Sequence, residues 1–235
     1  MKKVKFGIIG AGNIGAAHYE VFIKNEVPNA ELVAIADLVP AKLEAVLNME
    51  FEGASSLATF SDYKEMFASG LVDAVIVAVP HYFHPPITIE ALNAGLHVIC
   101  EKPAGVYTKQ VKEMNAVAGE SNVVFGMMFN QRTNPLYIKT RELVQSGEFG
   151  EIRRVNWIIT NWYRPQAYYN SGAWRATWSG EGGGVLLNQA PHNLDLWQWI
   201  CGMPVKVESH LHYGKWHNIE VEDDVTTYVE YPNGA

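Results

Sequence analysis

The feature that most constrains this chain is a glycine-rich stretch near its N-terminus, Gly10-Ala11-Gly12-Asn13-Ile14-Gly15. It follows an apolar run over 4–9 and opens a stretch with helical periodicity over 14–24. A second apolar run ends at Asp37, 22 residues after Gly15. This order is typical of a dinucleotide-binding βαβ unit, in which a strand, a Gly-x-Gly-x-x-Gly turn and a helix are followed by a second strand that ends in an acidic residue. The alternative is a glycine-rich turn in some other α/β protein.

Each position of the turn has a physical role in this interpretation. Gly10 permits the tight turn, Gly12 lets the backbone approach a pyrophosphate, and Gly15 lets the helix pack closely on the strand. The start of the helix supplies free N–H donors and the positive end of its dipole. Asp37 is placed to accept hydrogen bonds from a ribose 2′-hydroxyl, and its charge would repel a 2′-phosphate. We therefore expect NAD rather than NADP, bound by Gly10, Gly12, Asn13, Ile14, Gly15 and Asp37.

Composition restricts the class of protein. Of 235 residues, 48% are hydrophobic and 18% are charged, and the net charge is -7. These values predict a globular protein with a substantial core and no nucleic-acid or membrane partner. No apolar stretch approaches the roughly 20 residues of a membrane span. We recognise no secretory signal, and the two cysteines make no disulfide framework, so we expect a cytoplasmic protein.

The first half of the chain alternates strand and helix patterns. Near-continuous apolar runs, typical of parallel strands covered on both faces, occupy 4–9, 31–36, 73–79, 97–100 and 122–128. Helical patterns occupy 14–25, 40–48, 62–68, 85–94 and 108–119. We predict an α/β Rossmann domain, a doubly wound parallel sheet that binds NAD, over residues 1–127.

The pattern changes after residue 128. Helices over 135–146 and near 190–201, with strands near 204–216 and 222–231, predict an α+β domain with an open, mostly antiparallel sheet over 128–235. The segment 161–184 is rich in Trp, Tyr, Gly and Arg, and we interpret it as an active-site loop. The chain stops just after an Asn-Gly turn, which would leave an open sheet edge. We therefore expect a truncated form of a longer protein and an incomplete second domain.

Residues that carry chemistry follow two strands of the predicted parallel sheet. Glu101-Lys102-Pro103 follows the strand at 97–100, and the carboxyl ends of such strands line the ligand crevice. In one interpretation, Lys102 faces the cofactor in this crevice and Glu101 holds its ammonium group. An exposed Lys–Glu pair at the end of a strand is an equally good interpretation. Pro80 and His84 follow the strand at 73–79 and are candidates for contacts with the nicotinamide end of the cofactor. Alternatively, His84 is an ordinary neighbour of a helix start.

A third group begins with the glycines at 182–184 and continues to Asn188 and His192. The glycines allow close approach of the backbone to a ligand. Asn188 and His192 are four residues apart, so their side chains can point to one place at a helix start. Asp195 either orients the His192 ring or, as we favour, is an acid that the helix dipole stabilises. For His192, a site role and a structural role both stay open.

Together these residues resemble the Gfo/Idh/MocA oxidoreductases, a family that includes glucose–fructose oxidoreductase and inositol dehydrogenase. The similarity rests on the Gly-Ala-Gly-Asn-Ile-Gly start, on Glu101-Lys102-Pro103, and on the triple glycine followed by Asn188-x-x-x-His192, and it covers essentially the whole chain. It implies a Rossmann domain followed by an α+β domain with a large open sheet, through which subunits pair into homo-oligomers. It also implies hydride transfer between a secondary alcohol of a sugar or polyol and NAD(P).

The resemblance gives roles to particular residues. Lys102 corresponds to the family's catalytic lysine and His192 to its catalytic histidine. Asn188 stands where the family usually has an aspartate, as in some branches that act on sugars or nucleotide sugars, and it can hydrogen-bond a hydroxyl but cannot titrate. Besides Asn188 and His192, candidate substrate contacts are Asn130, Arg132, Arg164 and Arg175 and the aromatic residues Trp162, Tyr163, Trp174 and Trp178, of which about half are expected only to pack. We predict no metal site.

Two other functions stay open. One is an NAD-dependent redox-neutral glycosidase, since relatives of this family use the same lysine-bearing fold for transient oxidation, elimination and re-reduction. Release of a leaving group from a glycoside without net NADH would identify it. The other is a non-catalytic NAD-binding sensor, although a sensor has no need of both Lys102 and His192. NAD binding without turnover of any sugar would identify that function.

Overall fold

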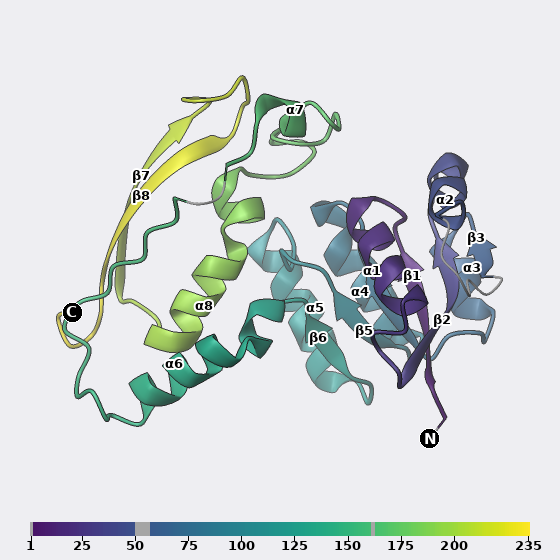
Figure 1. The fold of residues 1–235 in the computed structure, drawn as a ribbon, viewed down its shortest axis with the longest axis horizontal. Helices are drawn as coiled ribbons and strands as arrows, with labels where there is room; N and C mark the ends of the chain where they lie inside the picture. The colour runs from purple at the N-terminus through teal and green to yellow at the C-terminus, as the bar shows by residue number, and fades with distance from the viewer. Residues whose placement is uncertain (1, 50–56, 161–162) are drawn as a thin grey trace. The chain divides into compact units, whose positions relative to one another are not determined.

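The chain folds as two compact units, Met1–Met128 (unit 1) and Phe129–Ala235 (unit 2) (Figure 1). The structure, a computed structural model, describes residues 2–49, 57–160 and 163–235, so the substrate candidate Trp162 lies outside the described residues. Within these ranges, none of the helices combines the length and the apolar character that a bilayer span requires.

Unit 1 is built on a parallel sheet with the strand order β3-β2-β1-β4-β5-β6. The chain winds outward from β1 in both directions, which is the predicted doubly wound Rossmann arrangement. In chain order its elements are β1 (Val4–Ile9), α1 (Asn13–Ile23), β2 (Ala30–Ala36), α2 (Pro40–Leu47), β3 (Ala58–Phe60), α3 (Tyr63–Ala68), β4 (Ala74–Val77), the 3-10 helix η1 (His81–Phe83), α4 (His84–Asn93), β5 (His97–Cys100), α5 (Thr108–Glu120) and β6 (Phe125–Met127).

Both faces of this sheet are covered, because successive side chains of a strand point to opposite sides. Ile8 and Ile76 pack in one hydrophobic cluster with residues of α1 and α2. Their strand neighbours Ile9 and Val75 pack in a second cluster with residues of α3, α4 and α5. Burial on both faces explains why these strands read as near-continuous apolar runs in the sequence.

Some details of unit 1 differ from the predictions. β3 was not predicted, because a strand of three residues leaves no apolar pattern to recognise; it pairs with β2. β4 and β6 are shorter than the predicted strands at 73–79 and 122–128. Both pair with β5, which has only four residues and so limits the length of both ladders.

Unit 2 combines helices with an antiparallel pair of strands, as predicted for an α+β domain. Its elements are the 3-10 helix η2 (Asn130–Thr133), α6 (Pro135–Gln145), α7 (Gln166–Tyr169), the π-helix η3 (Val185–Gln189), α8 (Pro191–Cys201), β7 (Lys206–Tyr213) and β8 (Glu222–Glu230). α6 and α8 pack against each other. The predicted turn after the last strand is present over 231–234, with Gly234 at a φ of 81°.

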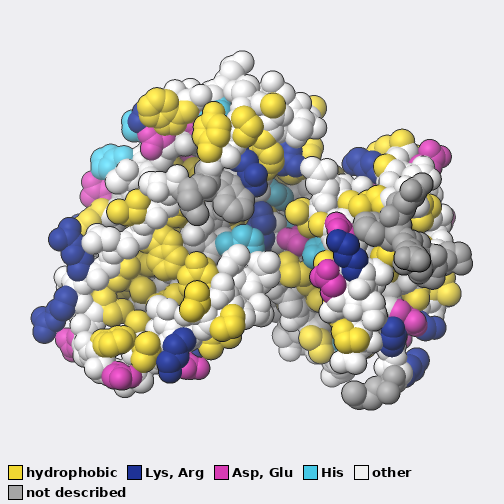
Figure 2. Space-filling view, in the orientation of Figure 1, with side chains coloured by type: hydrophobic (Ala, Val, Ile, Leu, Met, Phe, Trp, Pro, Cys, Tyr) yellow, Lys and Arg dark blue, Asp and Glu magenta, His cyan; other side chains and the backbone are white. Residues whose placement is uncertain are grey.

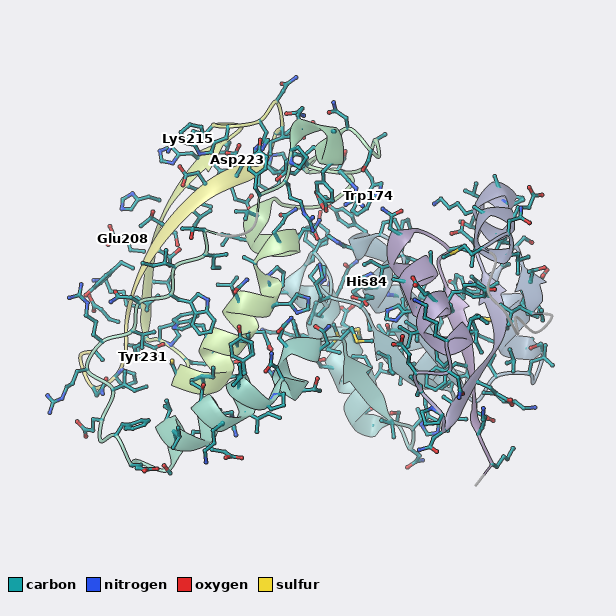
Figure 3. All side chains as sticks on the ribbon, in the orientation of Figure 1. His84, Trp174, Glu208, Lys215, Asp223 and Tyr231 are labelled. Atoms are coloured by element: carbon teal, nitrogen blue, oxygen red, sulfur yellow. The ribbon has the colours of Figure 1, made fainter. Side chains whose placement is uncertain are left out.

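The connection between β7 and β8 is held by the Asp223 carboxylate, which lies beside Lys215 in Figure 3. It accepts hydrogen bonds from the backbone N–H groups of Lys215, Trp216 and His217 at 2.9, 2.8 and 3.0 Å. Burial raises the pKa of Asp223, but these donors and the His217 ring outweigh it, so that the pKa falls below its ordinary value. One carboxylate, whose side chain is 1% exposed, thus fixes residues 215–217 of the connection.

The strands of unit 2 leave apolar side chains at the surface. All but one residue of β7 are exposed, and Val207, Tyr213 and Tyr228 are among the exposed large hydrophobic residues. Figure 2 shows apolar side chains gathered on the surface of this unit. A surface of this kind suits association, and the homo-oligomer expected from the resemblance stays a prediction.

The glycine-rich turn after β1 generates a stability prediction. A Cβ on Gly15 would lie 1.8 Å from the Gly10 carbonyl oxygen, whereas a Cβ on Gly12 meets no atom of the described residues within 4 Å. Gly15→Ala is therefore expected to lower the melting temperature by about 4 °C or more. Gly12→Ala is expected to keep the wild-type melting temperature but to weaken NADH binding. Thermal unfolding and NADH fluorescence titration of both variants check this, and equal melting temperatures would contradict it.

Candidate active site

The turn between β1 and α1 presents open backbone at the start of a helix. Gly10 has a φ of 100°, and a Cβ there would lie 2.3 Å from the Ala78 carbonyl oxygen, so this position requires glycine. Asn13 and Ile14 are exposed, and within the described ranges no side chain caps α1. The space around Gly12 and the uncapped first turn of α1 fit a pyrophosphate.

Asp37 follows β2 and is tied to the same turn. Its Oδ2 accepts the Ala11 N–H at 2.8 Å, and its Oδ1 accepts the Val39 N–H at 2.8 Å. Because each carboxylate oxygen can accept two hydrogen bonds, the side chain keeps acceptor capacity for ribose hydroxyls while the backbone fixes its orientation. The arrangement fits a dinucleotide, and the role of Asp37 toward the ribose stays a prediction.

His84, labelled in Figure 3, connects the loops that follow β4 and β5. Its Nδ1 lies 2.6 Å from the carbonyl oxygen of Pro103, whose peptide bond to Lys102 is cis, and its Nε2 lies 2.7 Å from that of Val79. The residue is 1% exposed, and burial lowers the pKa of its imidazole. Both ring nitrogens lie at hydrogen-bond distance from backbone carbonyls, so His84 joins these two loops. The expected contact of His84 with the nicotinamide stays a prediction.

Glu101 has partners that the sequence does not indicate. Its Oε1 lies 2.8 Å from Nε2 of His18 in α1, and its Oε2 accepts the Lys102 backbone N–H at 3.2 Å. The carboxylate is buried and links the loop after β5 to the helix after the glycine-rich turn. The expectation that Glu101 holds the Lys102 ammonium stays a prediction, and the contacts above fix the Lys102 backbone.

Three neighbouring strands of unit 1 bring candidate residues to one edge of the sheet. β1, β4 and β5 are adjacent and parallel, and Gly10, Pro80 and Lys102 follow their carboxyl ends. Pro80 is exposed and Lys102 is half-buried. Because open α/β sheets bind ligands outside the carboxyl ends of their strands, Lys102 lies at the edge where this fold binds its cofactor.

In unit 2, Asn188 and His192 occupy different helical elements. Asn188 lies in the π-helix η3, which ends where the N–H of the following Ala190 donates to the Val185 carbonyl at 2.7 Å. His192 lies in the first turn of α8. The sequence predicted one regular helix near 190–201 and did not predict the π-turn before it. Single π-turns within helices are often found at functional sites.

Asn188 belongs to a buried polar network. Its Nδ2 donates to the Oε1 of Glu181 and, at 3.4 Å, to the Tyr168 hydroxyl. The same hydroxyl accepts a hydrogen bond from Nη1 of Arg175 at 2.7 Å. Asn188 and Glu181 are both buried, at 8% and 1% exposure. Tyr168 and Glu181 were missed in the sequence, because neither belongs to a motif.

Arg132, a predicted substrate contact, pairs with Asp195 of α8. Its Nε lies 2.8 Å from Oδ2 and its Nη2 lies 2.5 Å from Oδ1, which is a bidentate ion pair. The guanidinium also lies over the rings of Phe129 and Trp199, at 5.8 and 5.5 Å from their centroids. The hydrogen bond to Asp195 raises the pKa of Arg132. The structure thus pairs Asp195 with Arg132. If Arg132 also contacts a substrate, as predicted, it does so while bound to Asp195.

The other predicted substrate contacts lie in η2 and in the segment 163–178 of unit 2. Asn130 is exposed in η2, and Tyr163 is 75% exposed beside the His217 ring. Arg175 lies over the half-buried Trp174, labelled in Figure 3, at 4.6 Å, and also over Tyr168 at 4.5 Å. The remaining candidates are Arg164, which lies over Tyr168 at 4.6 Å, and Trp178, which lies against Tyr213. Among the described residues, no group of three or more His, Cys, Asp or Glu side chains is placed to hold a metal ion.

Comparison with known proteins finds similarity over both units. Residues 4–129 match the family described as an oxidoreductase family with an NAD-binding Rossmann fold. Residues 137–235 match the GFO/IDH/MocA C-terminal domain. Together the two matches cover most of the chain.

Individual relatives agree with these matches. An inositol 2-dehydrogenase from Corynebacterium glutamicum is 28% identical over 240 residues; the alignment covers 100% of this chain but only 65% of the relative. The WlbA dehydrogenase from Bordetella pertussis, solved with NADH and UDP-GlcNAcA, is 31% identical with a TM-score of 0.85, covering 100% of this chain and 69% of that one. A myo-inositol 2-dehydrogenase from Lactobacillus plantarum is 28% identical with a TM-score of 0.82, and the match covers 100% of this chain and 68% of that one.

The pair between Arg132 and Asp195 predicts a loss of stability on substitution. Asp195→Asn removes the charge and one of the two acceptors from a side chain that is 8% exposed. It is expected to lower the free energy of unfolding by about 1–2 kcal/mol. The control is Glu142→Gln in the exposed pair with Lys139, which is expected to change it by less than about 0.5 kcal/mol. Urea unfolding measures both, and equal losses would contradict the structural role of this partly buried pair.

Proposed function

This chain belongs to the Gfo/Idh/MocA family of NAD-binding oxidoreductases, and from that premise we propose that it is an NAD-dependent dehydrogenase of sugars, polyols or their derivatives. The proposed reaction moves a hydride between a secondary alcohol carbon and the nicotinamide. The names of its relatives, inositol 2-dehydrogenase and WlbA dehydrogenase, support this class of reaction. The chain spans 65% of the inositol dehydrogenase from Corynebacterium glutamicum, so the proposal concerns the activity of the whole protein.

The observation that carries the proposal is the position of Lys102 in unit 1. It follows β5 at the same sheet edge as the glycine-rich turn after β1, with only β4 between the two strands. Two buried side chains fix its surroundings, since Glu101 accepts the Lys102 backbone N–H and His84 contacts the Pro103 carbonyl. A lysine whose backbone is held at the edge where this fold binds its cofactor supports the proposed role of its side chain in the reaction.

Bound NAD would supply the hydride acceptor, and the residues of the chain would handle the proton and the charge. We assign His192 as the general base that takes the hydroxyl proton. Lys102 donates a hydrogen bond to the hydroxyl oxygen and stabilises the negative charge that develops there. Asn188 holds a substrate hydroxyl without titrating. The other proposed contacts are Asn130, Tyr163, Trp174 and Arg175 for the substrate, with the glycine-rich turn, Asp37, Pro80 and Glu101 for the cofactor.

Replacement of Lys102 tests the proposed chemistry. The protein is mixed with NAD⁺ and a panel of polyols, aldoses, uronic acids and glycosides, and nicotinamide absorbance is followed. We expect a rise with one class of substrate, reduced by about 100-fold or more in Lys102→Ala, because an electrostatic contact to the reacting oxygen is lost. NADH affinity should stay within about threefold. The control is Lys112→Ala, an exposed residue of α5, which should keep wild-type turnover.

The outcomes separate the candidate functions. Wild-type turnover in Lys102→Ala would contradict the role of Lys102. Release of a leaving group from a glycoside without net NADH would favour the redox-neutral glycosidase. NADH binding without turnover of any member of the panel would favour a sensor.

Asp37 carries the proposed preference for NAD. Its carboxylate repels a 2′-phosphate, so Asp37→Ala is expected to reduce the ratio of the Kd for NADPH to that for NADH by about tenfold, or 1.4 kcal/mol. The matched control is Asp73→Ala, since Asp73 also accepts a backbone N–H, that of Lys5 at 3.0 Å, but precedes its strand and so lies at the opposite edge of the sheet. Fluorescence titration measures both ratios. An unchanged ratio in Asp37→Ala would show that Asp37 does not select the cofactor.

A further inference from the structure

A buried carboxylate lies directly against Asn188, a residue to which we assign a substrate contact. That carboxylate belongs to Glu181, which is 1% exposed and whose Oε1 accepts a hydrogen bond from Asn188 Nδ2. Glu181 has no part in the proposed reaction. A buried carboxylate is costly unless it is paired or hydrogen-bonded, so its position beside a site residue calls for an explanation.

The Glu181 side chain is fixed from its other end. Its Oε2 accepts the Ala176 N–H at 2.5 Å, and its own backbone N–H donates to the Thr177 carbonyl at 2.9 Å. Ala176 itself has a φ of 53°, a conformation that non-glycine residues seldom adopt. The loop before the triple glycine therefore holds one carboxylate oxygen in place and presents the other to Asn188.

The carboxylate determines which way the Asn188 amide faces. Its Oε1 accepts a hydrogen bond from Asn188 Nδ2, so the NH₂ group of the amide faces Glu181. A flipped amide would place two oxygens against each other. The Tyr168 hydroxyl takes a second hydrogen bond from the same NH₂ group at 3.4 Å and is itself bound by Arg175. Both partners therefore hold the Oδ1 acceptor on the side away from Glu181.

We propose that Glu181 is a positioning residue that fixes the Asn188 amide so that its Oδ1 accepts a hydrogen bond from a substrate hydroxyl. The pair would then present one acceptor oxygen, Asn188 Oδ1, to the substrate, while the Glu181 carboxyl group lies behind the amide on its NH₂ side. The inference rests on the proposed function. It adds that Asn188 selects a substrate with a hydroxyl group that donates a hydrogen bond to Oδ1.

The pair predicts that two damaging substitutions compensate each other. Glu181→Gln introduces an amide that can donate, so that Asn188 can turn its oxygen inward. Asn188→Asp places two carboxylates in buried contact, which disfavours their joint ionisation. Each single variant is expected to lose roughly 100-fold in kcat. In the double variant the introduced amide donates to the introduced carboxylate, which again presents an acceptor, and kcat should recover to at least about tenfold above either single variant.

The experiment is a double-mutant cycle on the full chain, with kcat, KM and melting temperature measured for the wild type, both single variants and the double variant. NADH affinity should not change in any of them, because the cofactor-binding turn belongs to unit 1. The matched control is Glu222→Gln. Glu222 is also buried, but its carboxylate accepts the N–H groups of Gly184 and Leu186 at 3.0 and 3.1 Å. Its loss should lower the melting temperature, and Asn188→Asp should not rescue it.

The readouts separate failure of this inference from failure of the proposed function. If the wild type turns over no substrate, the proposed function fails, while recovery of the melting temperature in the double variant still supports the pair. Losses in kcat and melting temperature that simply add in the double variant would overturn the inference. Where the wild type is active, recovery of the melting temperature without recovery of kcat would also overturn it, because the contact would then be structural only.

Discussion

The close contact between the two ends of the glycine-rich turn is the constraint on which unit 1 depends. The Gly10 carbonyl oxygen occupies the space that a side chain on residue 15 would need, so α1 can pack against β1 only if that residue is glycine. This packing places the open N-terminal turn of α1 at the carboxyl edge of the sheet. The same edge carries the ends of β4 and β5, and hence Lys102.

Around this frame, buried polar side chains hold the loops that carry the chemistry. His84 joins the loops after β4 and β5, and Glu101 joins Lys102 to α1 through His18. Unit 2 follows the same principle, with Glu181 on Asn188 and Glu222 on the N–H groups at 184 and 186. A buried polar group is tolerated only when its hydrogen bonds are made, so each of these residues fixes its partner.

The sequence predicts the parts of this structure that depend on local pattern. The alternation of apolar runs and helical periods predicted the fold of unit 1, because burial on two faces makes each strand a continuous apolar run. β3 was too short to leave such a record, and the π-turn before Pro191 follows no periodicity that we can read. The contacts of Arg132 with Asp195 and of His84 with Pro103 join residues distant in sequence. Motif spacing does not reveal such contacts, and from it we predicted only a substrate contact for Arg132 and a cofactor contact for His84. Glu181 lies beside a motif but outside it.

We propose that this chain moves a hydride between an alcohol carbon and nicotinamide with the help of Lys102. Transfer of deuterium from the alcohol to the cofactor is the direct test of this reaction. Polyols and sugars carrying deuterium at their carbinol carbons are incubated with the full chain and NAD⁺, and the nicotinamide product is examined by mass spectrometry. We expect one deuterium in the NADH formed from one substrate class, and almost none with Lys102→Ala. Bound cofactor that acquires no deuterium from any of these compounds would rule out the proposed hydride transfer.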